Sequence, residues 1–270
     1  MTELLPPVRD LPPGRHTRIR AEIERAAGRR RGRLVPVLAG AAAVAAVVTS
    51  VLLLQPPPEP TPAVHVTSAP PAPLPPEEVK AVEEGCSSSA GTGQAKLRQY
   101  RDEETRWALL YSGNAALTCT IGAPDQQYNS GFAQTAIGWL PGHFSLDTVS
   151  ASVGGDRDGR PGFAGRPGYR TIVGRVDGQV TRVAVEVDGR TLEAGVAAGT
   201  FAVRVYYPPD WQIPVEDGDI TVRAYDANGA LLGDSSDLAK SCWADPQTGA
   251  VLYGDTRGPR DQCLPASPWK

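Results

Sequence analysis

Residues 181–196 read TRVAVEVDGRTLEAGV, and this stretch decides the fold class. Three valines alternate with Arg, Ala and Glu before Asp188-Gly189, which is the period of two of a β-strand buried on one face. Asp-Gly between two such runs is typical of a type I′ turn, which joins two strands through two residues. The stretch therefore predicts an antiparallel β-hairpin.

Similar runs lie on both sides of this hairpin. Strands are predicted at 106–112, 116–122, 134–140, 144–153, 201–207, 220–224 and 230–232. Gly113-Asn114-Ala115 separates the first two runs, and the turn residues DANG at 226–229 precede the last. Short strands at this spacing, with turn residues between them, predict a mainly β chain folded as an antiparallel β-sandwich.

The stretch ITVRAYDANG, residues 220–229, resembles the final hairpin of immunoglobulin-like extracellular modules, in which V-x-A-Y-D-x-x-G is common. The resemblance implies an immunoglobulin-like sandwich for this part of the chain.

A second informative stretch is LVPVLAGAAAVAAVVTSVLLL, residues 34–54, which carries no charge. About 20 apolar residues cross the roughly 30 Å hydrocarbon core of a bilayer as a helix. The run RRRGR at 29–33 predicts that the N-terminus stays in the cytoplasm. We therefore expect one transmembrane helix in the cell membrane, with the C-terminal domain extracytoplasmic. Cleavage after the apolar segment, near residues 61–63, is the alternative.

Charge divides the chain at the same place. Residues 1–34 hold nine Arg and four acidic residues, a balance of +5, whereas the whole chain carries −3, which leaves −8 for the rest. Apolar residues at helical spacing between 15 and 33 predict a short amphipathic cytoplasmic helix, which either lies in the lipid headgroups or docks a cytoplasmic partner. Nucleic acid is not an expected partner, because the arm has no aromatic platform and no DNA-reading motif.

The basic arm, residues 1–33, contains RDLPPGRH at 9–16. It is similar to the juxtamembrane tails of actinobacterial single-pass proteins found beside extracytoplasmic-function sigma factors. The resemblance implies an anti-sigma-like or accessory signalling role, with a cytoplasmic regulatory protein bound through the arm. The arm lacks the H-x-x-x-C-x-x-C motif of zinc-containing anti-sigma factors.

Proline marks the boundary after the span. Residues 55–76 hold ten prolines, too many for a packed element and suited to an extended stalk. Beyond the stalk we expect an N-terminal β region with a short leading helix at 77–155. A Gly/Pro/Arg loop at 156–168 and a β-sandwich region with a disulfide-closed C-terminal segment at 169–270 follow.

All four cysteines, Cys86, Cys119, Cys242 and Cys263, follow the span, and none forms a C-x-x-C pair. An even number of cysteines in an oxidising location predicts structural disulfides. Three pairings are open, and the local one is favoured, which joins the first two cysteines and the last two.

The loop nearly repeats GRPGF, at 159–163, as GRPGY, at 165–169. Its Arg160, Phe163, Arg166 and Tyr169 offer cationic and aromatic contacts to an extracellular protein or a glycan. Trp211 is either a further exposed contact or a lid over the sheets. The alternative for the loop is a solvated linker, in which Gly159→Val changes the stability by less than ~0.5 kcal/mol.

Several catalytic motifs are missing: no G-x-S-x-G, H-E-x-x-H, P-loop or G-x-G-x-x-G occurs. His143 is the single histidine after the stalk and has no identified partner. Residues 156–159, DRDG, are similar to the opening of a calcium loop, but Pro167 stands where the bidentate acid is needed. We expect no catalytic residue, no cofactor and no metal.

These features predict a single-pass membrane protein that presents a disulfide-stabilised β-sandwich outside the cytoplasm. Its expected role is envelope signalling or regulation without catalysis. The alternative is a structural or adhesive extracellular module with a passive anchor.

Overall fold

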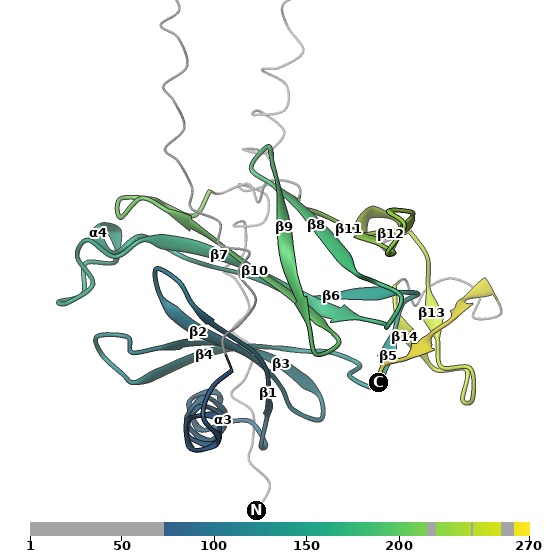
Figure 1. Ribbon diagram of the computed structural model, residues 1–270, viewed down its shortest axis with the longest axis horizontal. Helices are drawn as coiled ribbons and strands as arrows, with labels where there is room; N and C mark the ends of the chain where they lie inside the picture. The colour runs from purple at the N-terminus through teal and green to yellow at the C-terminus, as the bar shows by residue number, and fades with distance from the viewer. Residues whose placement is uncertain (1–72, 215–219, 239, 255–261) are drawn as a thin grey trace, which may run out of the picture. The chain divides into compact units, whose positions relative to one another are not determined.

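The computed structural model describes residues 73–214, 220–238, 240–254 and 262–270, in which antiparallel β-sheet predominates (Figure 1). The mainly β class is thereby confirmed. The predicted arm, apolar span and stalk up to residue 72 lie outside the described residues. No helix within the described ranges combines the length and the apolar character that a membrane crossing requires.

A helix and a four-stranded meander form the first layers. α3 (Pro76–Ala90) precedes β1 (Lys96–Asp102), β2 (Arg106–Tyr111), β3 (Ala115–Ile121) and β4 (Tyr128–Gln134), which pair antiparallel in that order. The helix begins at Pro76, because N–H groups of the first turn have no acceptor within the helix and proline, which lacks the N–H, costs nothing there. It ends before Gly91, whose φ is 62°. The Cys86–Cys119 disulfide joins the helix to β3, as predicted.

The β2–β3 hairpin confirms the first predicted pair of strands, whereas the strand predicted at 134–140 is wrong. The meander ends with β4 at Gln134, and only a two-residue strand, β5 (Trp139–Leu140), follows. The physical reason is a buried arginine. Nη1 of Arg175 donates hydrogen bonds to three backbone carbonyls between residues 136 and 139, so the chain turns around this side chain and does not run from 134 to 140 as one strand.

The largest sheet has seven antiparallel strands in the order β12-β11-β8-β9-β10-β7-β6. They are β6 (Phe144–Ser152), β7 (Gly168–Val176), β8 (Arg182–Val187), β9 (Arg190–Ala197), β10 (Thr200–Tyr207), β11 (Thr221–Tyr225) and β12 (Leu231–Asp234). β9 and β10 pair only through residues 195–197 and 200–202, so the sheet divides there into two halves.

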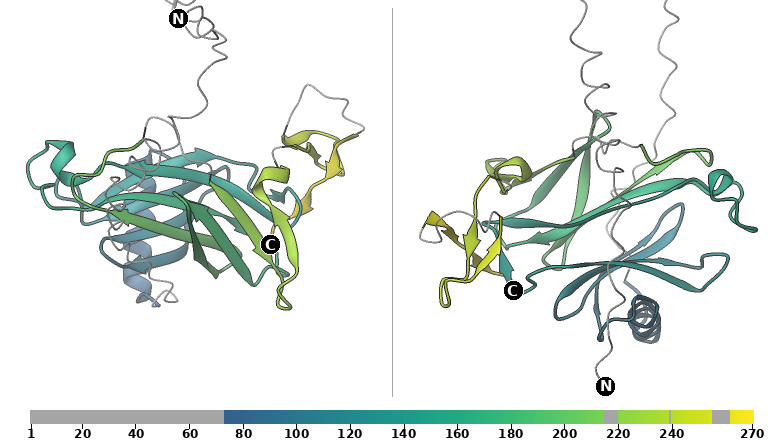
Figure 2. Two further views of the ribbon diagram at one scale, coloured as in Figure 1. Left: turned by 90° about the horizontal axis from the view of Figure 1, so that it is seen from above. Right: turned by 180° about the vertical axis from the view of Figure 1, so that it is seen from behind.

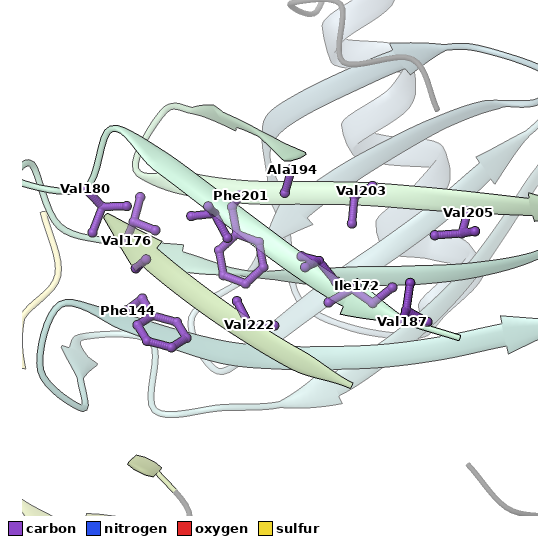
Figure 3. Close-up of a cluster of buried hydrophobic side chains, with 13 residues drawn as sticks. Phe144, Ile172, Val176, Val180, Val187, Ala194, Phe201, Val203, Val205 and Val222 are labelled. Carbon is purple, nitrogen blue, oxygen red and sulfur yellow. The ribbon is translucent and has the colours of Figure 1, made fainter. Parts of the chain in front are cut away.

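The two halves face each other across one apolar core. β6, β7 and β10 contribute side chains from one half, and β8, β9 and β11 from the other (Figure 3). The two edge strands also meet, because a Cβ at Gly233 of β12 would lie 2.9 Å from the Phe144 ring of β6. The two opposed antiparallel halves are consistent with the predicted sandwich.

The hairpin of β8 and β9 is the one predicted. Asp188 and Gly189 have φ values of 50° and 70°, both positive, as a type I′ turn requires. Val183, Val185 and Val187 are all buried in the core between the two halves.

We expect Gly189→Val to destabilise the β layers by about 1–3 kcal/mol, because a β-branched residue is strained at positive φ. Gly178 is the matched control, since it lies in the β7–β8 turn outside the positive-φ region and a Cβ there meets no atom within 4 Å. Gly178→Val should change the free energy of unfolding by less than ~0.5 kcal/mol. Thermal unfolding of a 73–270 fragment measures both variants, and equal losses would contradict the turn assignment.

A second core, which we call the seam, lies between the meander and the strands β7 and β10. Trp107, Leu109 and Tyr111 of β2 pack there against Val173 of β7 and Ala202 of β10. β7 and β10 are therefore covered on both faces, and nearly every residue along them is buried. The layers follow the order α3, meander, β6-β7-β10 and β8-β9-β11-β12 (Figure 2).

The Gly/Pro/Arg loop at 156–168 joins β6 to β7, two neighbouring strands of one sheet. The boundary drawn there between two β regions therefore falls inside a sheet. The remaining elements are short: α4 (Gly155–Asp158), α5 (Ser235–Leu238), β13 (Trp243–Ala244), β14 (Val251–Tyr253), β15 (Leu264–Pro265) and β16 (Ser267–Pro268). The predicted Cys242–Cys263 disulfide is formed beside the small sheet of β13, β14 and β15.

Candidate functional site

One end of the strands collects the loops that carry the predicted binding residues. We call it the loop end, and α4 marks it in Figure 1. The β6–β7 loop, the β8–β9 turn and the described start of the β10–β11 loop (208–214) all leave their strands there. Contacts tie these segments together, since Gly154 N–H donates to the Trp211 carbonyl at 3.0 Å and Arg170 pairs with Asp188 at 3.7 Å.

The β6–β7 loop is folded rather than extended. α4 forms one helical turn where the sequence predicted only a Gly/Pro/Arg loop. Gly155 N–H donates to the Arg166 carbonyl at 2.9 Å and so closes the loop on itself. Gly159 ends α4 with a φ of 71°, which strains a β-branched residue as Gly189 does. The premise that valine is tolerated at Gly159 is therefore wrong.

Gly154 allows this loop to pack on the β10–β11 loop, and Gly155 allows the loop to close on itself. A Cβ at Gly154 would lie 2.1 Å from the carbonyl oxygen of Pro209, and one at Gly155 would lie 1.7 Å from that of Phe163. The same close approach lets Asp156 N–H donate to the Pro209 carbonyl at 2.9 Å. The loop is thus held in one conformation, and a preorganised loop loses less entropy when it binds a partner.

Arg160, Phe163 and Arg166 lie together on this loop. The guanidinium of Arg160 is 4.0 Å from the centroid of the Phe163 ring, and that of Arg166 is 6.0 Å away. Arg160 also donates to Asp158 at 2.8 Å and to Asp125 at 2.6 Å. The hydrogen bond between Arg160 and Asp158 lowers the pKa of Asp158 and raises that of Arg160. Half of the Arg160 side chain, 50%, stays exposed, so it presents a cation whose charge is already balanced.

Trp211 lies beside this group and stacks on Tyr207, with ring centroids 4.1 Å apart and planes inclined by 11°. Burial, followed by a hydrogen bond from its hydroxyl to the Asp188 carboxylate, raises the pKa of Tyr207. The buried Arg170 lies 5.8 Å from the Trp211 ring. Trp211 is itself half-buried, so it covers Arg170 and still presents part of its ring to solvent. The structure thus shows both features on which the two predictions for Trp211 depend, a buried residue beneath the ring and an exposed part of the ring.

Tyr169 does not share this surface, although the repeat grouped it with Phe163. Its side chain enters the seam, where its hydroxyl lies 3.1 Å from Oγ1 of Thr120 and its ring lies 4.1 Å from the Arg204 guanidinium. The reason is strand parity. Tyr169 already belongs to β7, and in a strand it must face the side opposite to Arg170.

The other end of the strands brings together polar side chains that are far apart in the sequence. Nδ1 of His143 lies 2.8 Å from the Asp177 carboxylate, which gives His143 a partner that sequence analysis missed. Among the described residues, Asp177 is the side chain that hydrogen-bonds to His143. No cluster of three or more His, Cys, Asp or Glu suited to a metal ion occurs within the described ranges.

Two cavities open at this second end. One has a volume of about 610 Å³ and is lined by Asp177 among others; the other has about 470 Å³ and is lined by His143. The second also borders Trp243, whose Nε1 is buried and has no hydrogen-bond partner. No sequence motif predicted either cavity, because the lining residues come from turns far apart along the chain.

No protein-family model, curated protein or solved structure matches the chain. The case for a function therefore depends on these residues and their geometry.

Proposed function

We propose that the chain is a single-pass membrane protein whose β layers lie outside the cytoplasm. The observation that carries this proposal is the pair of disulfides, Cys86–Cys119 and Cys242–Cys263. Disulfides form and persist in oxidising compartments. The apolar residues 34–54, preceded by the arginines at 29–33, supply an anchor with the N-terminus in the cytoplasm. For the finer fold we propose an immunoglobulin-like class, supported by the two opposed antiparallel halves and the β11–β12 hairpin.

The proposed role is envelope signalling or regulation without catalysis, of the anti-sigma-like kind. The loop end supports a contact with an extracellular protein or glycan, because arginine and aromatic side chains on a fixed loop are typical anchors of interfaces. The basic arm at 1–33 supports a contact with a cytoplasmic regulatory protein. Neither contact needs a cofactor.

A structural or adhesive module is the second candidate. The rigid loop end favours it, because hydrogen bonds within the described part hold the binding residues in place without any contribution from the arm.

Reporter fusions test the topology. Alkaline phosphatase folds only outside the cytoplasm, so in a bacterial host we expect activity from a fusion after residue 72 and none from a fusion after residue 28. Green fluorescent protein is the reverse reporter, because it does not fluoresce after export through the general secretory route. It should therefore fluoresce when fused after residue 28 and stay dark when fused after residue 72. Phosphatase activity at residue 28 alone would overturn the proposal.

Two further variants separate signalling from adhesion. Deleting residues 2–28 should abolish the transcriptional effect of a signalling protein and leave an adhesive module unchanged. Phe163→Ala combined with Arg160→Ala is the matched change at the loop end, and it should weaken the extracellular contact in both cases. A transcriptional effect that survives the deletion favours the adhesive module.

A further inference from the structure

The two disulfides differ in their access to solvent. Cys86 and Cys119 are 0% exposed in the core between α3 and the meander. Cys242 and Cys263 are each partly exposed, beside the small sheet of β13 to β15, at the end of the molecule opposite α4 (Figure 1). An attacking thiolate must reach a sulfur atom before exchange begins. Cys242–Cys263 is therefore the more accessible of the two disulfides.

Cys263 begins a segment, residues 263–270, that we call the strap. Its backbone contacts are short: Leu264 N–H donates to the Cys242 carbonyl at 2.9 Å, and Ala266 N–H donates to the Ala244 carbonyl at 2.8 Å. β16 adds two residue pairs with β5. Leu264 is 46% exposed, so it does little to anchor the strap.

One side chain fastens the strap to the seam. Nε1 of Trp269 donates to the Gly199 carbonyl at 2.8 Å, and its ring lies 5.3 Å from the ring of Tyr111. The guanidinium groups of Arg98 and Arg175 lie 4.7 and 5.3 Å from the same ring. Trp269 therefore covers buried residues of the meander and of β7 at this end.

The strap also forms part of the wall of both cavities. Pro268 and Lys270 line the cavity of about 610 Å³, and Leu264, Pro265 and Ser267 line that of about 470 Å³. Displacement of the strap therefore opens both cavities at once.

We propose that Cys242–Cys263 is a thiol–disulfide exchange site that controls the docking of the strap. The reductant is a dithiol, which in protein form is a C-x-x-C oxidoreductase. One of its thiolates attacks a sulfur of the pair, which forms a mixed disulfide and releases the other cysteine as a thiolate. The second thiolate of the reductant then displaces the remaining cysteine, each released thiolate takes a proton, and the reductant becomes the disulfide.

This inference goes beyond the proposed role and does not depend on the membrane anchor. Without the cross-link the strap is held by Trp269, the buried Ala266 and two short ladders, whereas the buried Cys86–Cys119 keeps the meander closed. Exchange at Cys242–Cys263 thus frees the strap and opens the two cavities, and it leaves the loop end at the other end of the strands unchanged.

Selective reduction is the first measurement. Full-length protein in detergent is treated with graded dithiothreitol, alkylated with iodoacetamide and mapped by mass spectrometry. We expect Cys242 and Cys263 to be labelled at least about tenfold faster than Cys86 and Cys119, because only they are accessible. Equal rates, or faster labelling of Cys86 and Cys119, overturn the proposal.

Hydrogen exchange on the selectively reduced protein is the second measurement. Amides of the strap should exchange at least about tenfold faster than in the oxidised protein, while those of β2 and β3 keep their rates. Trp269→Ala, with the disulfide intact, is the matched control and should loosen the strap without new thiols. Unchanged exchange of the strap after reduction refutes its control by the disulfide, and faster exchange through β2 and β3 as well refutes a local device.

Discussion

Replacing Asp147 with Ala is expected to destabilise the β layers by about 3–5 kcal/mol, which is the usual effect of leaving a buried charge without its partner. Asp147 of β6 and Arg175 of β7 have 1% and 0% of their side chains exposed, and Nε of Arg175 donates to Asp147 at 2.8 Å. Burial alone lowers the pKa of Arg175, but the hydrogen bond and the charge of Asp147 outweigh it and raise that pKa. Arg175 therefore keeps its charge in the folded protein.

The pair also connects several segments, which makes its loss more damaging than the loss of one contact. Asp147 accepts a hydrogen bond from the Tyr111 hydroxyl at 2.8 Å, and Arg175 donates to the Tyr253 hydroxyl at 2.8 Å. Burial and the neighbouring Asp147 raise the pKa of Tyr111 well above its usual value. Asp147→Ala thus loosens β2, the β6–β7 pair and β14 together.

Arg223 supplies the matched control on the surface. It pairs with Asp234 at 2.9 Å and with Glu186 at 3.2 Å, but 37% of its side chain is exposed. Arg223→Gln should therefore cost less than about 1 kcal/mol. Urea unfolding of the 73–270 fragment measures both variants. If Arg223→Gln lowered the free energy of unfolding as much as Asp147→Ala does, burial would not explain the large effect at Asp147.

The sequence was sufficient for features that depend on neighbouring residues. The alternation and the Asp188-Gly189 turn predicted β8 and β9, because strand period and turn conformation are both local. The local disulfide pairing followed from cysteines that bracket short segments. Composition predicted the loop at 156–168, but not which of the four proposed contact residues lie together, since Tyr169 turns into the seam where β7 begins.

Features that depend on a third layer were not readable from the sequence. When arginine alternates with apolar residues along a strand, the face that carries the arginine is predicted to be exposed to solvent. In the structure Arg175 of β7 and Arg204 of β10 are buried, because the meander covers that face. The prediction of a strand at 134–140 was wrong for the same reason, because carbonyls of this segment accept hydrogen bonds from Arg175. The meander determines the burial of both arginines and the course of residues 134–140, and the residues next to them in the sequence do not indicate that the meander packs there.

Trp107→Ala is expected to cost about 3–5 kcal/mol of stability, the range for truncating a fully buried large aromatic residue. Trp107 is 0% exposed in the seam, and its Nε1 donates to Glu103 at 3.2 Å. Its ring also lies 4.5 Å from the guanidinium of Arg204. Unfolding in urea, with the 73–270 fragment as reference, measures the loss.

The position of Arg204 adds to the effect of volume. No carboxylate among the described residues forms an ion pair with Arg204, whose hydrogen bonds go to Oγ1 of Thr171 at 2.9 Å and Oγ1 of Thr105 at 3.0 Å. Burial lowers the pKa of Arg204, so the Trp107 and Tyr169 rings help to stabilise a charge that water cannot reach.

Trp107→Phe distinguishes the two contributions of the indole ring. It keeps an aromatic ring in the seam beside Arg204 and removes the hydrogen bond to Glu103, so we expect a loss of only about 1–2 kcal/mol. A loss equal to that of Trp107→Ala would assign the stabilisation to the hydrogen bond instead. Because Glu103 also accepts from the Tyr206 hydroxyl at 3.1 Å, that result would mean that a polar network, and not aromatic packing on Arg204, holds the meander to β10.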